Sequence, residues 1–157
     1  MKKFIFIIVA IMFVGTFNTH AQNVNIENLK GEKVSFSDVI KGDKPVVVSF
    51  WATWCKPCLM EMDALKDIKE DWEGKIRVVS ISIDDSRSKN KVPSFVKGRN
   101  YPFEIYMDSN QELYKKLNVL NVPFLFIFSN GKQVYKHSGY SPGDEEYLIE
   151  EAMKYVK

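Results

Sequence analysis

Two cysteines, Cys55 and Cys58, are separated by two residues, and the sequence contains no others. A buried strand is predicted directly before them, over Val46–Phe50, and helical periodicity begins directly after them. A thiol at a helix N-terminus meets unpaired backbone N–H groups and the positive end of the helix dipole, which favour the thiolate. We therefore expect Cys55 to be an exposed nucleophile and the pair to undergo thiol–disulfide exchange.

Two other uses of the cysteine pair fit the sequence less well. A zinc site needs about four ligands, and the only histidines that could join the cysteines are His20 and His137. A purely structural disulfide between residues so close together closes a very short loop and restrains the unfolded chain little. The spacing therefore favours redox chemistry.

The first residues have the pattern of a secretory signal peptide. A basic start is followed by an unbroken apolar run over 4–14 and by a small-residue cleavage site that ends at Ala21. The alternative is an uncleaved membrane anchor, for which the run is shorter than the ~20 residues that span a bilayer. We expect residues 1–21 to be removed and residues 22–157 to form one exported domain. In a bacterium its location would be the periplasm or cell envelope.

Export also changes the charge of the chain. The full sequence has 22 basic and 20 acidic residues, and its first 21 residues contain two lysines and no acid. The exported chain is therefore expected to have no net charge. Binding to nucleic acid is not expected, because a neutral chain lacks the basic surface that such binding needs.

The rest of the chain alternates predicted strands and helices. Strands are predicted in a hairpin over 24–36 and over 46–51, 76–83, 103–106, 124–128 and 133–137, and helices over 89–99, 110–117 and 144–156. The helix after Cys55 is expected to continue through Trp72 and to stop at Gly74, because one apolar face persists that far. This order predicts an α/β fold with a mixed sheet.

Two motifs carry a resemblance to a known family. They are V-V-V-S-F-W-A-T-W-C-K-P-C-L-M-E at 46–61 and N-V-P-F-L-F-I-F at 121–128. The chain resembles the TlpA/ResA-like exported thiol–disulfide oxidoreductases of the thioredoxin superfamily over essentially all of 22–157. The resemblance implies a thioredoxin fold: a central mixed β-sheet flanked by helices, with an N-terminal β-hairpin and an inserted helix–strand segment over about 86–107. It implies no cofactor.

The resemblance also assigns roles around the cysteines. Cys55 would form a mixed disulfide with the substrate, and Cys58 would resolve it. Pro57 fits the first helical turn and would tune the two thiols together with Lys56, although Lys56 could also be a solvated cation without such a role. Trp54 would shield the site, unless it fills the core.

A second group of expected site residues lies farther along the chain. Pro123 would be a cis-proline that faces the disulfide, with Val122 beside it offering backbone hydrogen bonds to a bound peptide. The alternative is a trans-proline that opens a strand. Glu61 follows Cys58 by one helical turn and would exchange a proton with it. Alternatively, Glu61 would only complement the helix N-terminus.

Three residues depart from the patterns of the family and of the wider superfamily. Ser49 stands where thioredoxins have a buried aspartate, so proton transfer would depend on Glu61 or water. Asp63 stands where the family usually has a proline, which puts the expected helix kink in doubt. Asn121 stands where a glycine is common.

The leading hypothesis is an exported, monomeric reductant of protein disulfides. Its electrons would come from a membrane thiol-transferring reductase, and its substrates would include apocytochrome c. One alternative is a disulfide-forming oxidant. Another is a thiol peroxidase of the peroxiredoxin type, but its P-x-x-x-T-x-x-C motif is absent because Val48 and Ala52 occupy the proline and threonine positions. A non-catalytic binding module would not need the second cysteine.

Overall fold

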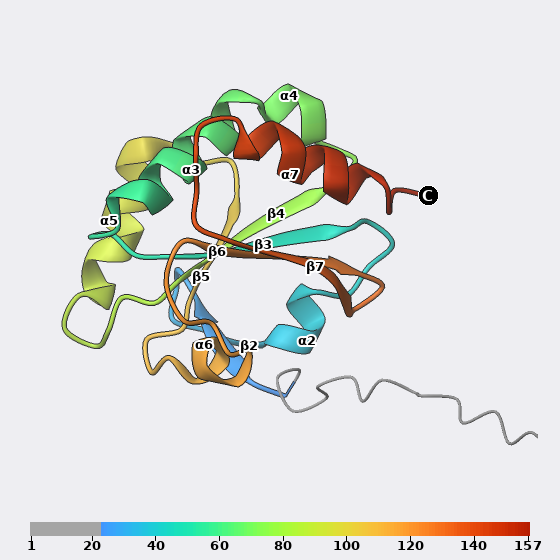
Figure 1. Ribbon diagram of the computed structural model, residues 1–157. Coiled ribbons are helices and arrows are strands. Elements are labelled where there is room, and N and C mark those ends of the chain that lie inside the picture. The colour runs from blue at the N-terminus through green and yellow to red at the C-terminus, as the bar shows by residue number, and fades with distance from the viewer. Residues whose placement is uncertain (1–22) are drawn as a thin grey trace, which may run out of the picture.

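One mixed β-sheet organises the residues that the computed structural model describes, 23–157 (Figure 1). Its strands are β1 (Asn25–Asn28), β2 (Lys33–Ser35), β3 (Val46–Trp51), β4 (Arg77–Ser82), β5 (Glu104–Met107), β6 (Phe124–Ser129) and β7 (Lys132–Ser138). They are ordered β2-β1-β5-β4-β3-β6-β7. The strands β3, β4 and β5 are parallel, whereas β1–β2, β1–β5, β3–β6 and β6–β7 pair antiparallel. The predicted mixed sheet and N-terminal hairpin are confirmed.

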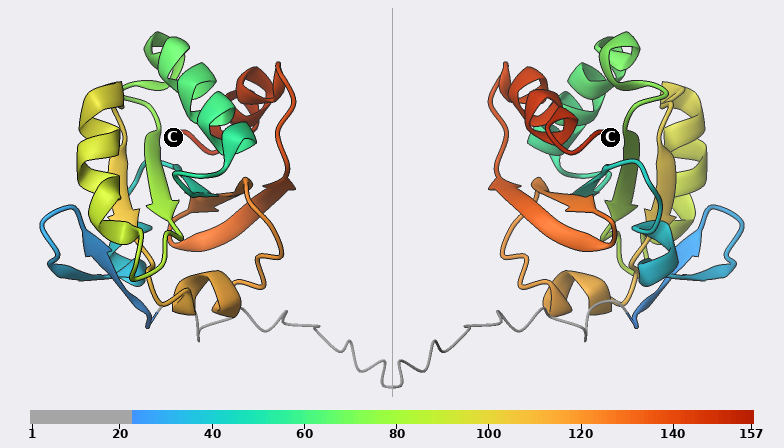
Figure 2. Two further views of the ribbon diagram at one scale, coloured as in Figure 1. Left: turned by 90° about the vertical axis from the view of Figure 1, so that its left-hand side faces the viewer. Right: turned by 90° about the vertical axis from the view of Figure 1, so that its right-hand side faces the viewer.

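Helices cover both faces of this sheet. They are α2 (Phe36–Val39), α3 (Lys56–Asp67), α4 (Lys69–Trp72), α5 (Val92–Arg99), α6 (Glu112–Lys116) and α7 (Asp144–Met153). The helices α3, α4 and α7 lie on one face, with α3 and α7 side by side, and α2 and α6 lie on the other (Figures 1 and 2). The inserted helix α5 packs beside α3, where Arg99 forms an ion pair with Asp63 at 2.7 Å.

The central strand β3 is buried along its whole length. All six of its residues are buried, because it has strands on both sides and helices on both faces. In its register with β6, Phe50 lies opposite Phe124. The residues just before β6 therefore lie at the same end of the sheet as the residues just after β3. This end carries the cysteines and Pro123.

One helix was missed, and two predicted helices end earlier than expected. The short helix α2 was not predicted, because a single helical turn is too short to show periodicity; its Phe36 packs edge-on against Phe128. The helix after Cys55 does not continue to Trp72: it breaks at Ile68 and resumes as α4, with the Trp72 indole donating to the Leu65 carbonyl at 2.8 Å. The last helix ends at Met153, three residues earlier than predicted.

The kink expected near position 63 was in doubt because Asp63 replaces a proline. Helix α3 runs unbroken through this position, and the Asp63 carboxylate accepts hydrogen bonds from Arg99 and from the Tyr101 hydroxyl. An aspartate keeps the backbone N–H that a proline would lack. Its side chain also ties α3 to the inserted segment.

The N-terminal expectations are not tested by the structure. The predicted cleavage after Ala21 and the alternative of a membrane anchor both fall on residues outside the described part of the chain. Within 23–157, no helix combines the length and the apolar character needed to cross a membrane.

Leu65 offers a test of the packing of α3 on the sheet. It is fully buried, so Leu65→Ala should lower the free energy of unfolding by about 2–5 kcal/mol. Urea unfolding followed by circular dichroism measures this change. The control is Leu120→Ala at an 88% exposed position, where a change within about 0.5 kcal/mol is expected. Equal losses in the two variants would contradict the described packing.

Candidate active site

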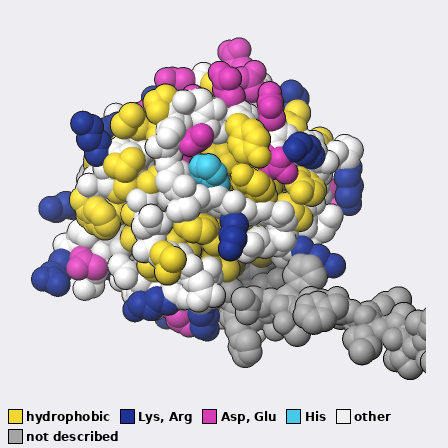
Figure 3. Space-filling view, in the orientation of Figure 1, with side chains coloured by type: hydrophobic (Ala, Val, Ile, Leu, Met, Phe, Trp, Pro, Cys, Tyr) yellow, Lys and Arg dark blue, Asp and Glu magenta, His cyan; other side chains and the backbone are white. Residues whose placement is uncertain are grey.

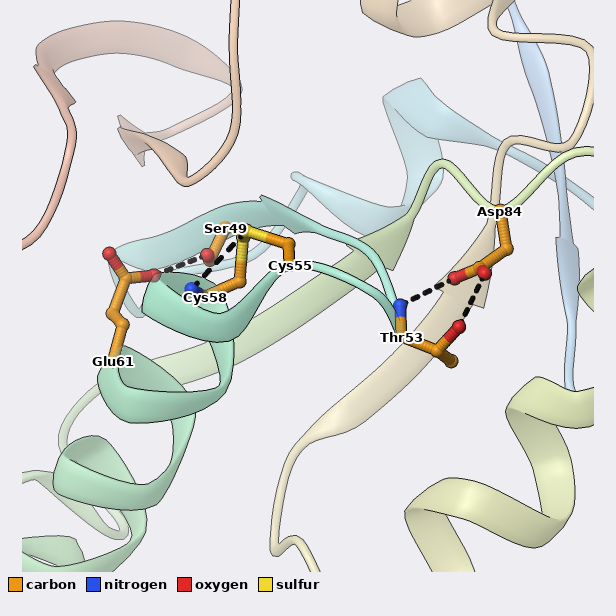
Figure 4. Close-up of a disulfide and its surroundings, with 6 residues drawn as sticks. All are labelled: Ser49, Thr53, Cys55, Cys58, Glu61 and Asp84. Atoms are coloured by element: carbon orange, nitrogen blue, oxygen red, sulfur yellow. Dashed lines mark hydrogen bonds between the residues drawn. A yellow bond between two sulfur atoms is a disulfide. The ribbon is translucent and has the colours of Figure 1, made fainter.

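The two cysteines form a disulfide at the start of α3 (Figure 4). Cys55 is the N-cap residue, and its Sγ accepts a hydrogen bond from the Cys58 backbone N–H at 3.3 Å. Pro57 occupies the first turn, as predicted. A thiolate at Cys55 would accept the same N–H and would lie at the positive end of the helix dipole.

The expectation that Cys55 is exposed was wrong in the oxidised state. Cys55 is 5% exposed and Cys58 is fully buried. The cause is local geometry, since the Cys55 sulfur turns toward the first helical turn, where it is bonded to the buried Cys58 sulfur. Cys55 is still the more accessible of the two residues, which is consistent with its role as the cysteine that an incoming thiolate reaches first.

A buried carboxyl group lies next to the disulfide. Glu61 is fully buried one helical turn after Cys58, and the Ser49 hydroxyl donates a hydrogen bond to its Oε1 (Figure 4). Its Oε2 has no hydrogen-bond partner among the described residues. Burial raises the pKa of Glu61 from 4.5 to about 7, the Ser49 hydrogen bond opposes this rise, and the charge of Asp144 adds to it.

These contacts bear on the two interpretations of Glu61. The first turn of α3 contains no acidic residue, and Glu61 lies beyond it. A fully buried carboxyl group in this position does not act mainly as a partner of the helix dipole, whose effect falls off within the first turn. Ser49, at the position of the missing aspartate, instead binds this carboxyl group. A carboxyl group with a pKa of about 7 can accept or donate a proton near neutral pH.

Asp84 was not among the predicted site residues, although it holds the segment before the cysteines. Asp84 is fully buried just after β4, and its carboxylate accepts hydrogen bonds from the Thr53 N–H at 2.8 Å and the Thr53 hydroxyl at 2.6 Å (Figure 4). It also accepts one from the Ser82 hydroxyl at 2.7 Å. The order of the predicted strands could have indicated this contact. Because β3 and β4 are parallel neighbours, the residues that follow each strand lie at the same end of the sheet.

The Val122–Pro123 peptide bond is cis, so the trans alternative was wrong. The Pro123 carbonyl accepts a hydrogen bond from the Gly139 N–H at 2.9 Å. Among residues 23–157, neither the N–H nor the C=O of Val122 has a hydrogen-bond partner. The segment before β6 therefore leaves backbone polar groups unpaired at the end of the sheet that carries the disulfide.

The Trp54 side chain is exposed to solvent and does not lie in the core. It is 66% exposed, which excludes core filling, and the fully buried tryptophan of this segment is Trp51. Hydrophobic side chains lie at several places on the face shown in Figure 3, including the side where α3 begins (Figure 1). Asn121 also has a structural use, since its side chain accepts a hydrogen bond from the Ser138 hydroxyl at 3.0 Å.

No arrangement for a metal ion is evident in the described part of the chain, where no three His, Cys, Asp or Glu side chains are grouped to hold one.

Comparisons with known proteins agree with this geometry. The AhpC/TSA family model matches residues 17–137. Thiol–disulfide oxidoreductase ResA of Bacillus thuringiensis is 32% identical over 131 residues, which cover 82% of this chain and 74% of ResA. Thioredoxin-like protein YneN of Bacillus subtilis is 33% identical over 108 residues, covering 68% of this chain but only 62% of YneN.

A solved structure extends the agreement to the fold. The solution structure of an uncharacterized thioredoxin-like protein from Porphyromonas gingivalis aligns with a TM-score of 0.75 and 36% sequence identity. The alignment covers 85% of this chain and 90% of that one. The predicted thioredoxin fold is confirmed.

Glu61 should make the stability of the oxidised protein depend on pH. Its pKa of about 7 exceeds the ordinary 4.5, so between these values the folded state holds a proton that the unfolded state has released. The free energy of unfolding should therefore fall by about 3 kcal/mol as the pH rises through this window. Glu61→Gln keeps an oxygen that accepts from Ser49 but cannot ionise, so it should lack this loss.

Urea unfolding at pH values below and above this window tests the expectation. The control is Glu150→Gln, which removes an exposed acid from α7 and should follow the wild-type profile. Parallel profiles for Glu61→Gln and the wild type would contradict a buried, titrating Glu61.

Proposed function

Because this chain belongs to the AhpC/TSA family and is a ResA-like thiol–disulfide oxidoreductase of the thioredoxin superfamily, we propose that it reduces disulfides in exported proteins. One observation carries the proposal: a disulfide caps α3 at the end of the sheet where Val122 offers an unpaired backbone. The disulfide supplies the chemistry, and the open backbone supplies a place for an extended protein segment.

The reaction starts from the reduced pair. The Cys55 thiolate attacks one sulfur of the substrate disulfide, which forms a mixed disulfide and releases the first substrate thiolate. The Cys58 thiol then gives its proton to Glu61 and attacks the Cys55 sulfur, which releases the second substrate thiolate. The substrate gains two electrons, and Cys55 and Cys58 return to the disulfide state. Protons from solvent and from Glu61 complete the substrate thiols.

Glu61 is suited to this transfer because it shares a helix face with Cys58 and is buried beside the sulfurs. A buried thiol cannot release its proton directly to water, so a neighbouring carboxylate speeds the second step. Ser49 holds one carboxylate oxygen, and the other remains free to accept the proton.

Substrate binding involves four residues around the disulfide. Trp54 and Pro57 flank Cys55 in the sequence, and Trp54 offers an exposed apolar surface. Val122 would pair through its free N–H and C=O with an extended substrate segment, and the buried Pro123 would set the direction of that backbone. A bound segment would thus place its own sulfur against Cys55.

The cellular setting of the proposal follows from the N-terminal segment. The chain would be exported, with residues 1–21 removed, and would act as a monomer in the periplasm or cell envelope. Because such compartments are oxidising, the pair needs an electron donor, for which we propose a membrane thiol-transferring reductase. Apocytochrome c, with its haem-attachment cysteines, is the proposed substrate in cytochrome c maturation.

The AhpC/TSA family match favours a second candidate, a thiol-dependent peroxidase. Val48 and Ala52 are both buried and apolar at the positions where the peroxidase motif has proline and threonine. Ala52 has no hydroxyl group that could bind a peroxide. Consumption of hydrogen peroxide by the reduced protein, with dithiothreitol as electron donor, would show this activity directly.

Substitution of each cysteine tests the assigned roles. Cys55→Ser should abolish the reduction of insulin disulfides, because it removes the attacking sulfur. Cys58→Ser should accumulate mixed disulfides with substrate proteins, since no thiol remains to resolve them. Insulin turbidity and non-reducing electrophoresis measure these outcomes. Full activity in Cys55→Ser would refute the proposed function.

The reduction potential of the pair tests the direction of electron flow. Titration in a glutathione or dithiothreitol redox buffer should give a value near the ~−270 mV of thioredoxin if the protein is a reductant. A value near the ~−120 mV of a strong periplasmic oxidant would instead identify a disulfide-forming enzyme.

A further inference from the structure

The most exposed large hydrophobic residues lie beside the proposed active site. Among the described residues, Leu120 is 88% exposed and Trp54 is 66% exposed, whereas the other exposed large hydrophobics range from 37% to 49%. Trp54 directly precedes Cys55, and Leu120 is three residues before Pro123. Single exposed hydrophobic residues are normal, but of the two most exposed ones here Trp54 is itself a proposed substrate-binding residue and Leu120 is two positions before another, Val122.

Leu120 is exposed within a segment that is otherwise held in place. On one side, Val119 is buried and its N–H donates to the Tyr114 carbonyl at 3.0 Å. On the other side, Asn121 accepts from the Ser138 hydroxyl, and the Pro123 carbonyl accepts from Gly139. These anchors limit the freedom of the backbone on both sides of Leu120. Its side chain is thus presented to solvent from a fixed position.

The position of Leu120 relative to Val122 defines what it can touch. The two residues are two positions apart in the chain, so their Cα atoms are at most about 7 Å from each other. A protein segment that pairs with the free N–H and C=O of Val122 as an added strand would therefore pass beside the Leu120 side chain. In such strand addition, backbone hydrogen bonds give affinity and the flanking side chains give specificity.

We propose that Leu120 is a specificity-determining residue, selecting protein disulfides whose cysteine has an apolar residue within about two positions of it. The partner is an extended substrate segment with leucine, isoleucine, valine or phenylalanine beside its cysteine. Trp54, which precedes Cys55, contacts the same substrate segment on the side nearer the disulfide. This inference rests on the proposed function and names the substrate class of that same site.

The test uses two disulfide-linked peptides of equal length and charge, one with leucine and one with serine beside each cysteine. The reduced wild-type protein should reduce the leucine peptide with a kcat/KM about tenfold higher, mainly through a lower KM. Leu120→Ser should bring the two peptides to within about twofold of each other. Hydroxyethyl disulfide, which has no flanking residues, should react equally with the wild type and with Leu120→Ser.

Leu29→Ser is the matched control. Leu29 is also exposed, at 37%, but it lies in the turn between β1 and β2, at the far edge of the sheet from the disulfide. This variant should keep the wild-type preference. Analytical ultracentrifugation of the wild type and of Leu120→Ser tests whether a second copy of the chain covers Leu120 instead.

The outcomes separate this inference from the proposed function. An unchanged leucine preference in Leu120→Ser, equal rates of the wild type with both peptides, or a wild-type dimer that Leu120→Ser dissociates would each overturn the inference and leave disulfide reduction intact. If the wild type reduced neither peptide but still reduced hydroxyethyl disulfide, both this inference and the proposed function would be overturned.

Discussion

The burial of β3 is the constraint on which the rest of the structure depends. The strand is closed on both sides by β4 and β6 and on both faces by helices, so its position and register are strongly determined. It delivers the cysteines to the start of α3 on one side, and through its pairing with β6 it brings Pro123 to the same end. The disulfide and the unpaired backbone of Val122 therefore lie at the same end of two neighbouring strands, although 63 residues of sequence lie between Cys58 and Val122.

Polar groups buried around β3 give the site its chemistry and its shape. Ser49 lies in the strand itself and binds Glu61, which remains largely protonated at the pH where an exposed carboxyl group would be ionised. Asp84, at the end of the neighbouring strand, binds both the backbone and the hydroxyl of Thr53 and so holds the turn before Cys55. One buried acid is thus paired with three donors and is structural, whereas the other keeps an unpaired oxygen beside the sulfurs.

The contrast between covered sulfurs and exposed apolar neighbours is consistent with a protein substrate. Cys55 exposes 5% of its surface, while Trp54 and Leu120 expose 66% and 88%. Recognition therefore has to come from the surroundings of the disulfide and not from the sulfurs themselves. Burial of these two side chains by a partner removes apolar surface from water and so stabilises the complex. This stabilisation favours the close approach that disulfide exchange requires.

The sequence by itself determined the sheet-forming segments, the cysteine pair and an α/β fold with a mixed sheet, because apolar runs, helical periodicity and the C-x-x-C spacing are local signals. The thioredoxin fold came from the resemblance to a known family. The sequence also placed Pro57, Glu61, Val122 and Pro123 near the cysteines, through the resemblance of two short motifs. Only the tertiary structure decided that Cys55 is covered, that Trp54 is exposed, that Ser49 binds Glu61 and that Asp84 holds Thr53. These properties arise from contacts between segments far apart in the chain, and burial and hydrogen bonding of this kind leave no periodic pattern along the sequence.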